Sequence, residues 1–395
     1  MLILLRQDLQ IRANKYSKKT NLIAFLNSYS EGLSGSDLRF IEISKRIMRN
    51  VALIVVTSKL GNDLCEKRGL NAKFFLTSKE NNFGNVFIIY VMRMLAAIFL
   101  RLEIDNNAIV YATSDFLPDV LPAYVLKFKK QVKWVQVIHH IQEKPFDRVG
   151  KSWFVNMFGF ISQRLSFALI KKRADLIIVV NPITREQLLK EAFNGKKVCI
   201  NYNGVNLNKV RDFMPSNKKY DCVFLGRLNV SKGIFDLLKV WSDIVAKKPS
   251  AKLAIIGKGE SQIEKRLRND VSRMKLQKNI DFCGYLDDSE AFGILKSAKV
   301  FLFPSYEEGF GIAILQAMAC GLPVVAYNLP VYRGVFDDKL ISVPLGRTDI
   351  MSQRAWFLLE HPEDAKLLSK AGMAIVKKYD WDKIAERELL LIESI

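Results

Sequence analysis

Short apolar runs recur along the first half of the chain, and each gives way to polar residues or glycine before the next helical pattern. These runs occupy residues 21–28, 51–58, 108–113, 134–138 and 174–180. Uninterrupted apolar runs of this length are typical of strands that are buried on both faces, as in parallel sheets covered by helices on both sides. Their alternation with helical patterns, for example over 37–49, predicts a doubly wound α/β unit.

The same pattern restarts after Asn203-Gly204, with runs at 221–225, 251–256, 280–283, 300–303 and 323–327. A polar stretch over 206–219, with Pro215 inside it, is the expected linker between the two units. The length of 395 residues suits two domains. Because ligands bind beyond the carboxyl ends of parallel strands, two such sheets predict a site in the cleft between them.

Positive charge is concentrated in the first half of the chain. Residues 1–200 hold 31 basic and 16 acidic residues, whereas residues 201–395 hold 29 and 24. This imbalance predicts that the first half meets an anionic partner, and charge alone leaves nucleic acid, a phosphorylated substrate and an acidic membrane surface open. Nucleic acid is the least favoured of the three, because we recognise no nucleic-acid-binding motif and the basic residues are scattered.

Cysteine and histidine are too few and too scattered to form a disulfide or metal framework. The five cysteines stand far apart without a C-x-x-C motif, and the chain has three histidines. This pattern argues against a disulfide scaffold and a thiolate zinc site, and it favours a reducing compartment. Two carboxylate pairs, Asp287-Asp288 and Asp337-Asp338, fall in polar stretches where exposed acids are commonplace. No metal requirement is expected.

Two segments bear on membrane contact. Residues 86–100 form the most apolar run, but it is shorter than the roughly 20 residues of a span and carries Arg93 at its centre. We therefore expect a buried core helix there. Residues 151–173 are rich in Trp and Phe and end in a basic cluster, which is typical either of a helix packed on a sheet or of a helix lying in a lipid interface. The few apolar residues before Arg6 are too short a run for a signal peptide.

Residues 301–326 carry the most informative motif. A predicted strand ends near Ser305, a glycine-containing loop follows, and a helix begins after it. The loop residues are Glu308, Gly309, Phe310 and Gly311. Its two glycines allow the backbone to come close to a ligand, and the unpaired amides at the positive end of the helix attract an anion. The motif therefore predicts an anion-binding turn with the carboxylate of Glu308 at its mouth.

A second motif lies at 226–233, directly after another predicted strand. Its sequence, Gly-Arg-Leu-Asn-Val-Ser-Lys-Gly, places Arg227 and Lys232 in one loop. Two fixed cations stabilise the negative charge that develops on a phosphate, without the help of a metal ion. The pair therefore predicts a phosphate-binding clamp.

These two stretches together closely resemble the retaining glycosyltransferases of family 4, which have the GT-B fold. The first is similar to the E-x7-E element of that family and the second to its G-R-L-x(3–4)-K-G loop. The resemblance covers roughly residues 20–395 and is densest from 221 to 327. It implies two Rossmann-like doubly wound domains that face each other across a cleft, with a nucleotide-sugar donor held mainly by the second domain.

The resemblance implies roles for individual residues. It puts Glu308 on the hydroxyls of the donor sugar and the backbone of Phe310 and Gly311 near the sugar and phosphates. It puts Arg227 and Lys232 on the diphosphate. The chain departs from the family at its second acid, which binds the nucleotide ribose and is here a glutamine. An amide offers one acceptor oxygen and two donor hydrogens where a carboxylate accepts twice, so the nucleotide preference stays open.

Weaker matches follow the family in the same order. Gly257 lies in a second glycine loop, and residues 283–286 resemble the segment whose backbone contacts the base. In the first half, the turn 31–37 resembles the loop that faces the diphosphate and the acceptor, and His139-His140 follow a strand where the family often has a histidine near the donor sugar. The predicted catalytic residues are Glu308, His139, Arg227 and Lys232, and the predicted donor-binding residues are Gly32, Gly35, Arg227, Lys232, Gly257, Tyr285, Leu286, Glu308, Gly309, Phe310, Gly311, Ile312 and Gln316.

The resemblance also gives each predicted segment a role. The basic residues of 1–20 predict an exposed lead-in, and the resemblance implies that residues 21–205 are an N-terminal acceptor-binding domain. Residues 206–375 are a C-terminal nucleotide-sugar-binding domain, and residues 376–395, which include Trp381, are a helix that crosses back to the first domain.

The sequence therefore predicts a retaining hexosyltransferase that moves a sugar from a UDP- or GDP-sugar to a lipid-linked or growing surface glycan. Neither a metal nor another cofactor is expected. The charge of residues 1–200 predicts contact with an anionic membrane surface, and the expected location is the cytoplasm, at the cytoplasmic face of the membrane. Two alternatives remain: a nucleotide-sugar 2-epimerase, which can share the two-domain architecture, and a non-catalytic sugar-nucleotide-binding protein, which Gln316 favours.

Overall fold

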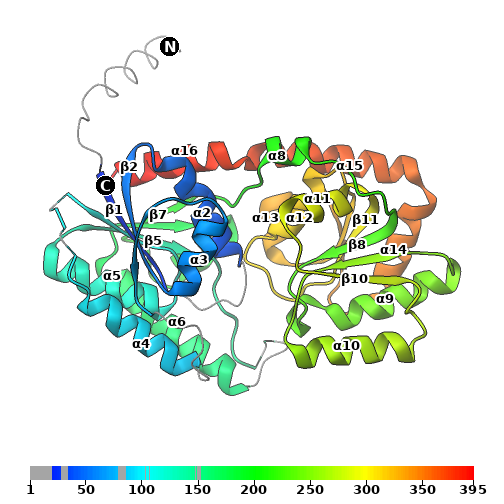
Figure 1. The fold of residues 1–395 in the computed structure, drawn as a ribbon, viewed down its shortest axis with the longest axis horizontal. Coiled ribbons are helices and arrows are strands. Elements are labelled where there is room, and N and C mark those ends of the chain that lie inside the picture. Colours follow the sequence, from blue (N-terminus) through cyan, green and yellow to red (C-terminus); the bar gives the residue numbers. More distant parts are fainter. Residues whose placement is uncertain are drawn as a thin grey trace, which may run out of the picture.

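The computed structural model describes residues 20–27, 34–78, 86–102, 104–105, 107–146, 148 and 153–395. Two parallel sheets, each flanked by helices, form two lobes that lie side by side (Figure 1). The predicted pair of doubly wound α/β units is therefore confirmed. The basic lead-in lies almost entirely outside the described residues, as does Gly32.

The first lobe contains a seven-stranded parallel sheet in the order β3-β2-β1-β4-β5-β6-β7. Its strands are β1 (Thr20–Leu26), β2 (Val51–Thr57), β3 (Lys73–Leu76), β4 (Ile109–Ala112), β5 (Lys133–Ile138), β6 (Leu176–Val179) and β7 (Lys197–Ile200). β1 pairs with β2 from Thr20↔Val51 to Leu26↔Thr57. Alternate residues of β1 enter separate cores, with Leu22 in one and Ile23 in the other, as a sheet covered on both faces requires.

Helices of the first lobe divide between the two faces of its sheet. The core on one face contains residues of α2 (Gly35–Ile47), α3 (Lys59–Lys67) and α16 (Trp381–Glu393). The core on the other face contains residues of α4 (Val86–Phe99), α5 (Leu117–Lys130), α6 (Trp153–Arg173) and α7 (Pro182–Lys190). The predicted helix at 37–49 thus begins two residues early, because Ser34 caps α2 by accepting the amide of Asp37.

The second lobe contains a six-stranded parallel sheet in the order β10-β9-β8-β11-β12-β13. Its strands are β8 (Tyr220–Leu225), β9 (Leu253–Ile256), β10 (Ile280–Gly284), β11 (Ala298–Phe303), β12 (Val324–Tyr327) and β13 (Ile341–Val343). The other elements are α8 (Leu207–Asp212), the 3-10 turn η1 (Val230–Lys232), α9 (Ile234–Lys247), α10 (Ser261–Arg273), α11 (Asp288–Lys296), α12 (Ile312–Ala319), α13 (Pro330–Phe336), α14 (Thr348–Glu360), α15 (Pro362–Val376) and the 3-10 turn η2 (Lys377–Tyr379). The predicted linker at 206–219 lies between the sheets and includes α8.

Three strands were not predicted, and all three lie at sheet edges. β3 and β7 end the first sheet, and β13 ends the second. Their side chains are partly exposed, so they lack the continuous apolar run that marks a strand buried on both faces. These three edge strands therefore escaped a search for such runs, whereas β10, at the other edge of the second sheet, was predicted from residues 280–283.

The prediction that 86–100 is a buried core helix is wrong. The segment does form a helix, α4, but α4 lies on the outside of the first lobe against α5. It buries Ile89, Arg93 and Ala97, while Val91 and Phe99 on its other face are exposed. High mean hydropathy indicated burial on all sides, whereas the protein buries only one face. Within the part of the chain that the structure describes, no helix is long and apolar enough to cross a membrane.

The chain crosses between the lobes twice, and the two crossings lie together. The residue after Gly204 pairs with Asp380 in an isolated parallel bridge, with the Val205 amide 2.8 Å from the Tyr379 carbonyl oxygen. A Cβ on Gly204 would lie 2.8 Å from that same oxygen, so glycine permits the close approach. Beyond the second crossing, α16 packs on α2 of the first lobe (Figure 1).

A buried ion pair fastens α16 to the first lobe. The guanidinium of Arg39 on α2 donates to both oxygens of Glu388 on α16, at 2.6 and 3.1 Å, and the two side chains are 1% and 0% exposed. The hydroxyl of Tyr111 on β4 donates to the same carboxylate, and so does the Asn201 amide. Charges this deeply buried are tolerated only when they are paired and hydrogen-bonded, which this group achieves.

Candidate functional site

Two helix N-termini, one from each lobe, meet where the lobes face each other. A Cβ built on Gly35, the first residue of α2, would lie 3.2 Å from Cδ1 of Ile312, the first residue of α12. α12 is capped by Gly311 at φ +93, a left-handed conformation that favours glycine. Since the amides of a first helical turn are unpaired and carry the positive end of the helix dipole, this junction favours an anion.

Lys232 and Glu308 lie together beside this junction. The Lys232 ammonium donates to the Glu308 carboxylate and, at 3.1 Å, to the carbonyl oxygen of Glu307. The position of Lys232 is set by η1, because the Asn229 side chain accepts the Lys232 amide at 2.9 Å. Arg227, at the end of β8, is exposed and close enough for its charge to act on Asp37 of α2. Residues predicted from two separate motifs are thus brought together.

His139 is held as a neutral ring at the end of β5. Its Nε2 lies 2.9 Å from the carbonyl oxygen of Thr113, which can only accept, so this nitrogen carries the proton. Burial, together with the charge of Arg39, lowers the pKa of His139 to about 3. Its remaining nitrogen, Nδ1, is therefore a hydrogen-bond acceptor near neutral pH. His139 can accept a hydrogen bond from a hydroxyl group through Nδ1. It is not suited to be a general acid, because its ring is neutral near neutral pH.

The loop that carries Glu308 is held by the first lobe through main-chain contacts. The Asn181 side chain, which caps α7, donates to the Gly309 carbonyl oxygen at 2.7 Å. A Cβ on Gly309 would lie 2.8 Å from the His139 carbonyl oxygen, so the two lobes approach too closely there for any side chain. Gly309 was predicted to make room for a ligand, and the structure shows that its nearest neighbour is the main chain of the opposite lobe.

An ion cluster that the sequence did not reveal lies beside the same loop. Arg148 of the first lobe donates to both oxygens of Glu307 at 3.0 Å, and the His140 ring lies 3.6 Å from that carboxylate. Although burial opposes ionisation, the contact with His140 and the charges of His140 and Arg148 lower the pKa of Glu307 to about 2. Burial disfavours protonated His140 as well, but the neighbouring Glu307 carboxylate raises the pKa of His140.

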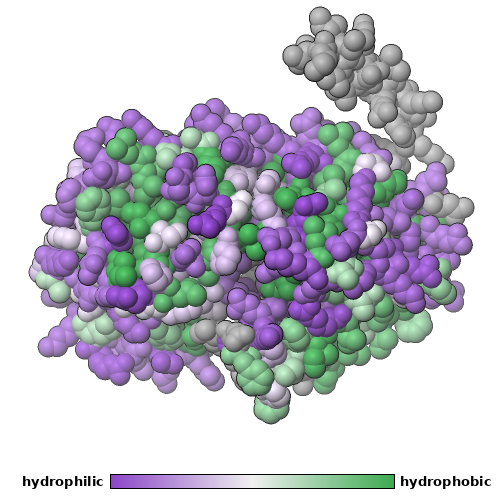
Figure 2. Space-filling view, turned by 180° about the vertical axis from the view of Figure 1, so that it is seen from behind, coloured by the Kyte–Doolittle hydropathy of each residue, from purple (hydrophilic) through white to green (hydrophobic). Residues whose placement is uncertain are grey.

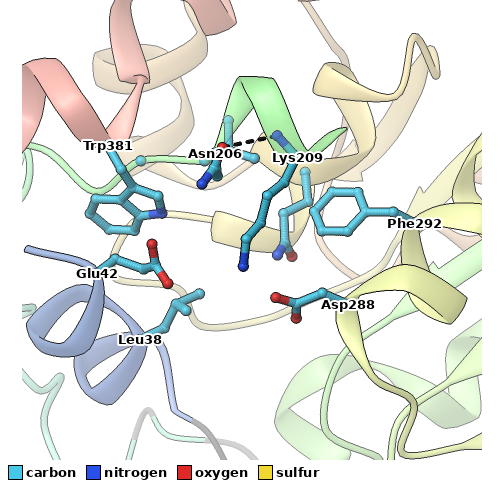
Figure 3. A pocket seen from close by; sticks show the side chains of 10 residues that line it. Leu38, Glu42, Asn206, Lys209, Asp288, Phe292 and Trp381 are labelled. Carbon is cyan, nitrogen blue, oxygen red and sulfur yellow. Dashed lines mark hydrogen bonds between the residues drawn. The ribbon is translucent and has the colours of Figure 1, made fainter. Parts of the chain in front are cut away.

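Gln316, a predicted donor-binding residue, lines a small pocket between the lobes, shown in Figure 3. Its volume is about 30 Å³, and it is lined by Leu38, Glu42, Gly204, Val205, Asn206, Lys209, Asp288, Phe292, Gln316 and Trp381. The Lys209 side chain points into it between the carboxylates of Glu42 and Asp288 (Figure 3). Gln316 therefore lies on the inter-lobe side of α12, among groups that can donate and accept hydrogen bonds.

Tyr285 and Leu286 lie at the carboxyl end of β10, beside this pocket. The Arg68 guanidinium of the first lobe donates to the Tyr285 hydroxyl at 3.1 Å and to Asp288 at 2.6 Å, which forms a second contact between the lobes. Leu286 is half-buried against the core of the second lobe. Gly257 packs against a neighbouring loop, since a Cβ there would lie 1.9 Å from the Gly226 carbonyl oxygen.

The Phe310 ring points away from the inter-lobe junction and into the core. It is buried among Tyr202, Phe336 and Tyr379, with ring centroids 5.7 to 6.4 Å apart. Only the main chain of Phe310 is available to a ligand. The sequence analysis likewise assigned the main chain, and not the ring, to contact with the sugar and phosphates.

The candidate carboxylate pairs are engaged in other contacts. Asp287 caps α11 and Asp288 is bound to Arg68, while Asp338 is paired with Lys339. Within the described ranges, no group of three or more metal-ligating side chains comes together.

In sequence, parts of this chain match proteins named as glycosyltransferases. Residues 208–387 match the family model of Glycosyl transferases group 1. An uncharacterized glycosyltransferase of Methanocaldococcus jannaschii is 26% identical over 61% of this chain and 62% of its own length. A phosphatidyl-myo-inositol mannosyltransferase of Mycobacterium leprae is 30% identical over 49% of this chain and 52% of its own length. The chain thus spans about half to three-fifths of the length of these relatives.

Solved structures agree over nearly the whole chain. HepE from Anabaena, in complex with UDP and glucose, covers 95% of this chain and all of its own with a TM-score of 0.75 at 17% identity. Sucrose-phosphate synthase from Thermosynechococcus elongatus covers 95% of this chain and 99% of its own with a TM-score of 0.77 at 16% identity. The chain therefore has the GT-B fold, and its residues 208–387 are similar to the Glycosyl transferases group 1 family.

Proposed function

We propose that this protein is a retaining glycosyltransferase that moves a hexosyl group from a nucleotide diphosphate-sugar to an acceptor. The observation that carries the proposal is the grouping of Lys232, Glu308 and Arg227 beside two facing helix N-termini. Fixed cations and unpaired amides together suit a diphosphate, and a carboxylate beside them suits sugar hydroxyls. In this proposal residues 206–375 hold the donor, residues 21–205 receive the acceptor, and residues 376–395 tie the two together.

Donor binding exchanges the partners of the Lys232–Glu308 pair. The diphosphate takes Lys232 and Arg227, and Glu308 is then free to accept hydrogen bonds from the donor sugar. The Nδ1 of His139 accepts a further hydroxyl, consistent with its neutral state. Gln316 bonds the ribose through its amide, and the main chain at Tyr285 and Leu286 faces the base. The proposed donor is a UDP- or GDP-sugar. In support, a relative from Xanthomonas oryzae is named GDP-mannose:cellobiosyl-diphosphopolyprenol alpha-mannosyltransferase, and the Anabaena neighbour holds UDP and glucose.

The chemical step is a displacement on one face of the sugar. The bond between the anomeric carbon and the β-phosphate oxygen breaks, and the acceptor oxygen bonds to the same face of that carbon. The acceptor proton passes to the departing phosphate oxygen. Arg227 and Lys232 stabilise the charge that develops on the phosphate, so the proposal needs no metal. Contact between the lobes excludes water, whose attack would hydrolyse the donor.

The proposed acceptor is a lipid-linked or growing surface glycan, and the proposed location is the cytoplasmic face of a membrane. The positive charge of residues 1–200 supports contact with an anionic membrane surface. Nucleic acid is not a proposed partner.

A second candidate function is non-catalytic binding of a sugar nucleotide, which Gln316 favours because the family carries an acid there. A panel of UDP-, GDP- and ADP-sugars tested by thermal shift identifies the donor, and donor turnover with glycan acceptors then separates the two functions. Donor binding without turnover on any acceptor would favour the non-catalytic binding protein over the glycosyltransferase. Formation of an epimer from the donor alone would instead indicate a 2-epimerase.

Glu308→Gln and Arg227→Ala test the site itself. Each is expected to lower kcat by about 10²–10³-fold, because each removes a group that acts on the reacting sugar or phosphate. Arg354→Ala, which removes an exposed arginine of α14, is the matched control and should leave kcat unchanged. Normal turnover by both site variants would contradict the assignment.

A further inference from the structure

The first lobe exposes the apolar sides of two helices, α4 and α6, which both pack against α5. On α4 the exposed apolar residues are Ile88, Val91, Met92, Leu95 and Phe99, whose spacing of three, four and seven residues puts them on one side of the helix. Phe99 is 75% exposed. Figure 2, which is turned by 180° from Figure 1, shows hydrophobic side chains gathered at the bottom centre and lower right of the molecule, on the lobe whose lower side carries α4 and α6 in Figure 1.

α6 repeats the arrangement of α4. Phe154, Ile161 and Leu165 follow one another at spacings of seven and four residues and are all exposed, Phe154 to 77%. Of the 21 large hydrophobic residues that are exposed in the described ranges, 13 lie between residues 88 and 165. We call the exposed sides of α4 and α6, with Phe146 and Trp153, the apolar face.

Both helices already pack against the lobe by their other sides. α4 buries Ile89 and Ala97, and α6 buries Phe167 and Ile170. A helix that is apolar on both sides needs an apolar environment on both, and large exposed apolar patches on a folded protein mark interaction sites. The apolar face therefore needs a partner that the described residues do not provide.

Charge identifies the chemistry of that partner. Neither α4 nor α6 contains an acidic residue, and α6 ends in Lys171-Lys172-Arg173. α5, which lies against both helices, ends with Lys129 and Lys130, which are exposed. A second copy of the same face would bring like charges together, whereas an anionic bilayer offers acyl chains to the apolar residues and phosphates to the lysines.

The apolar face reaches the site between the lobes. Phe146 and Trp153 lie in contact at its edge, with their rings tilted and the ring centroids 5.9 Å apart. Arg148, two residues after Phe146, binds Glu307, the neighbour of Glu308. An exposed aromatic residue of the apolar face, Phe146, therefore lies two residues along the chain from a residue that contacts the Glu308 loop.

We infer that the apolar face docks on an anionic phospholipid bilayer and so presents the inter-lobe site to an acceptor anchored in that bilayer. The statement about the acceptor rests on the proposed glycosyl transfer, whereas the docking does not. An acceptor of this class has its reacting hydroxyl on a head group at the bilayer surface, within reach of the start of α6. A water-soluble sugar has no need of this surface.

Vesicle binding by the full chain, without donor or acceptor, tests the docking. Phosphatidylglycerol–phosphatidylcholine vesicles should sediment the protein, whereas pure phosphatidylcholine vesicles should do so weakly, and added salt should reduce binding. Phe154→Asp with Ile161→Asp should lower the partition coefficient at least about tenfold, because two apolar side chains lose their burial. The control, Leu367→Asp with Leu390→Asp, alters two equally exposed leucines outside the apolar face and should bind as the parent does.

Fluorescence provides a second measurement, because Trp153 is the exposed tryptophan of the apolar face and Trp134, Trp241 and Trp381 are buried. Anionic vesicles should shift the emission to shorter wavelength, and Trp153→Phe should remove the shift while preserving sedimentation. The inference is overturned if the parent protein does not bind anionic vesicles. It is also overturned if the face variant, Phe154→Asp with Ile161→Asp, binds them as strongly as the control does. So does a dimer in solution that the face variant alone dissociates, since the occupant would then be a second copy. Thermal shift by the donor, which should be equal in parent and face variant, shows separately whether the proposed transfer site is intact.

Discussion

Replacing Glu388 by glutamine removes the charge that neutralises the buried Arg39 guanidinium. Arg39 and Glu388 are 1% and 0% exposed, so water cannot take the place of the lost carboxylate. Breaking such a pair costs about 3–5 kcal/mol, because the remaining charge stays buried without compensation. Glutamine keeps the shape of the side chain and one acceptor oxygen. We therefore expect Glu388→Gln to lower the free energy of unfolding by about 3 kcal/mol, the lower end of that range. That is a large part of the roughly 5–15 kcal/mol by which domains are stable.

Urea unfolding followed by tryptophan fluorescence measures this loss as a lower midpoint at an unchanged slope. Asp382→Asn on the same helix is the matched control: Asp382 pairs with Arg46 of α2 but is 65% exposed, so it should cost less than about 1 kcal/mol. The double variant Arg39→Met with Glu388→Leu should recover most of the stability, since no charge is left buried. The reasoning is refuted if Glu388→Gln has the same urea midpoint as Asp382→Asn. It is also refuted if the double variant is less stable than Glu388→Gln.

Two further changes act where the lobes meet. Gly309→Ala would place a Cβ 2.8 Å from the His139 carbonyl oxygen, so the lobes must separate slightly; we expect kcat/KM for sugar transfer to fall by about tenfold or more, measured with the identified donor and acceptor. The contact between His140 and Glu307 should depend on pH: Glu307, with a pKa of about 2, stays ionised, and the pKa of His140 is raised, so the contact is present at low pH and is lost as the pH rises through that raised value. The stability that the contact contributes should therefore decline above the ordinary histidine value of about 6.5, and His140→Gln should remove this part of the pH dependence of Tm.

Matched controls exist for both changes. Gly195 has open space where a Cβ would lie, so Gly195→Ala should leave kcat/KM unaltered. His361 is exposed at the end of α14, so His361→Gln should keep the parent's pH dependence. Equal activity of the two glycine variants, or equal pH profiles of the two histidine variants, would count against the inter-lobe contacts as described.

The parts of the fold that sequence predicted are those whose physical cause is local. A central strand such as β1 is buried on both faces and needs a continuous apolar run, which is visible in the sequence. β3 and β13, at sheet edges, need no such run and were missed. For α4, hydropathy indicated how apolar the helix is but not where its apolar sides point, because that depends on which neighbours the topology supplies.

The candidate site divides in the same way. Glu308 and Lys232 were found because each lies in a contiguous motif after a strand. Arg148 and Glu307 were missed because their pairing joins residues 159 positions apart, and neither belongs to a spacing that a linear motif can express. The Arg39–Glu388 pair, 349 positions apart, was missed for the same reason. Contacts between lobes are set by the closure of the whole chain and not by any local pattern.

The paired crossings at Val205 and Asp380 determine how the lobes can move. Two lobes that are joined at one edge by adjacent segments can rotate about that edge, which then acts as a hinge. In Figure 1 the crossings lie at the top of the molecule and α6 lies at the bottom, so the largest displacement occurs at the end of the inter-lobe junction that is farthest from the crossings. With its first lobe resting on a surface, the protein would keep the second lobe free to swing, and reagents would enter and leave on the side nearest that surface.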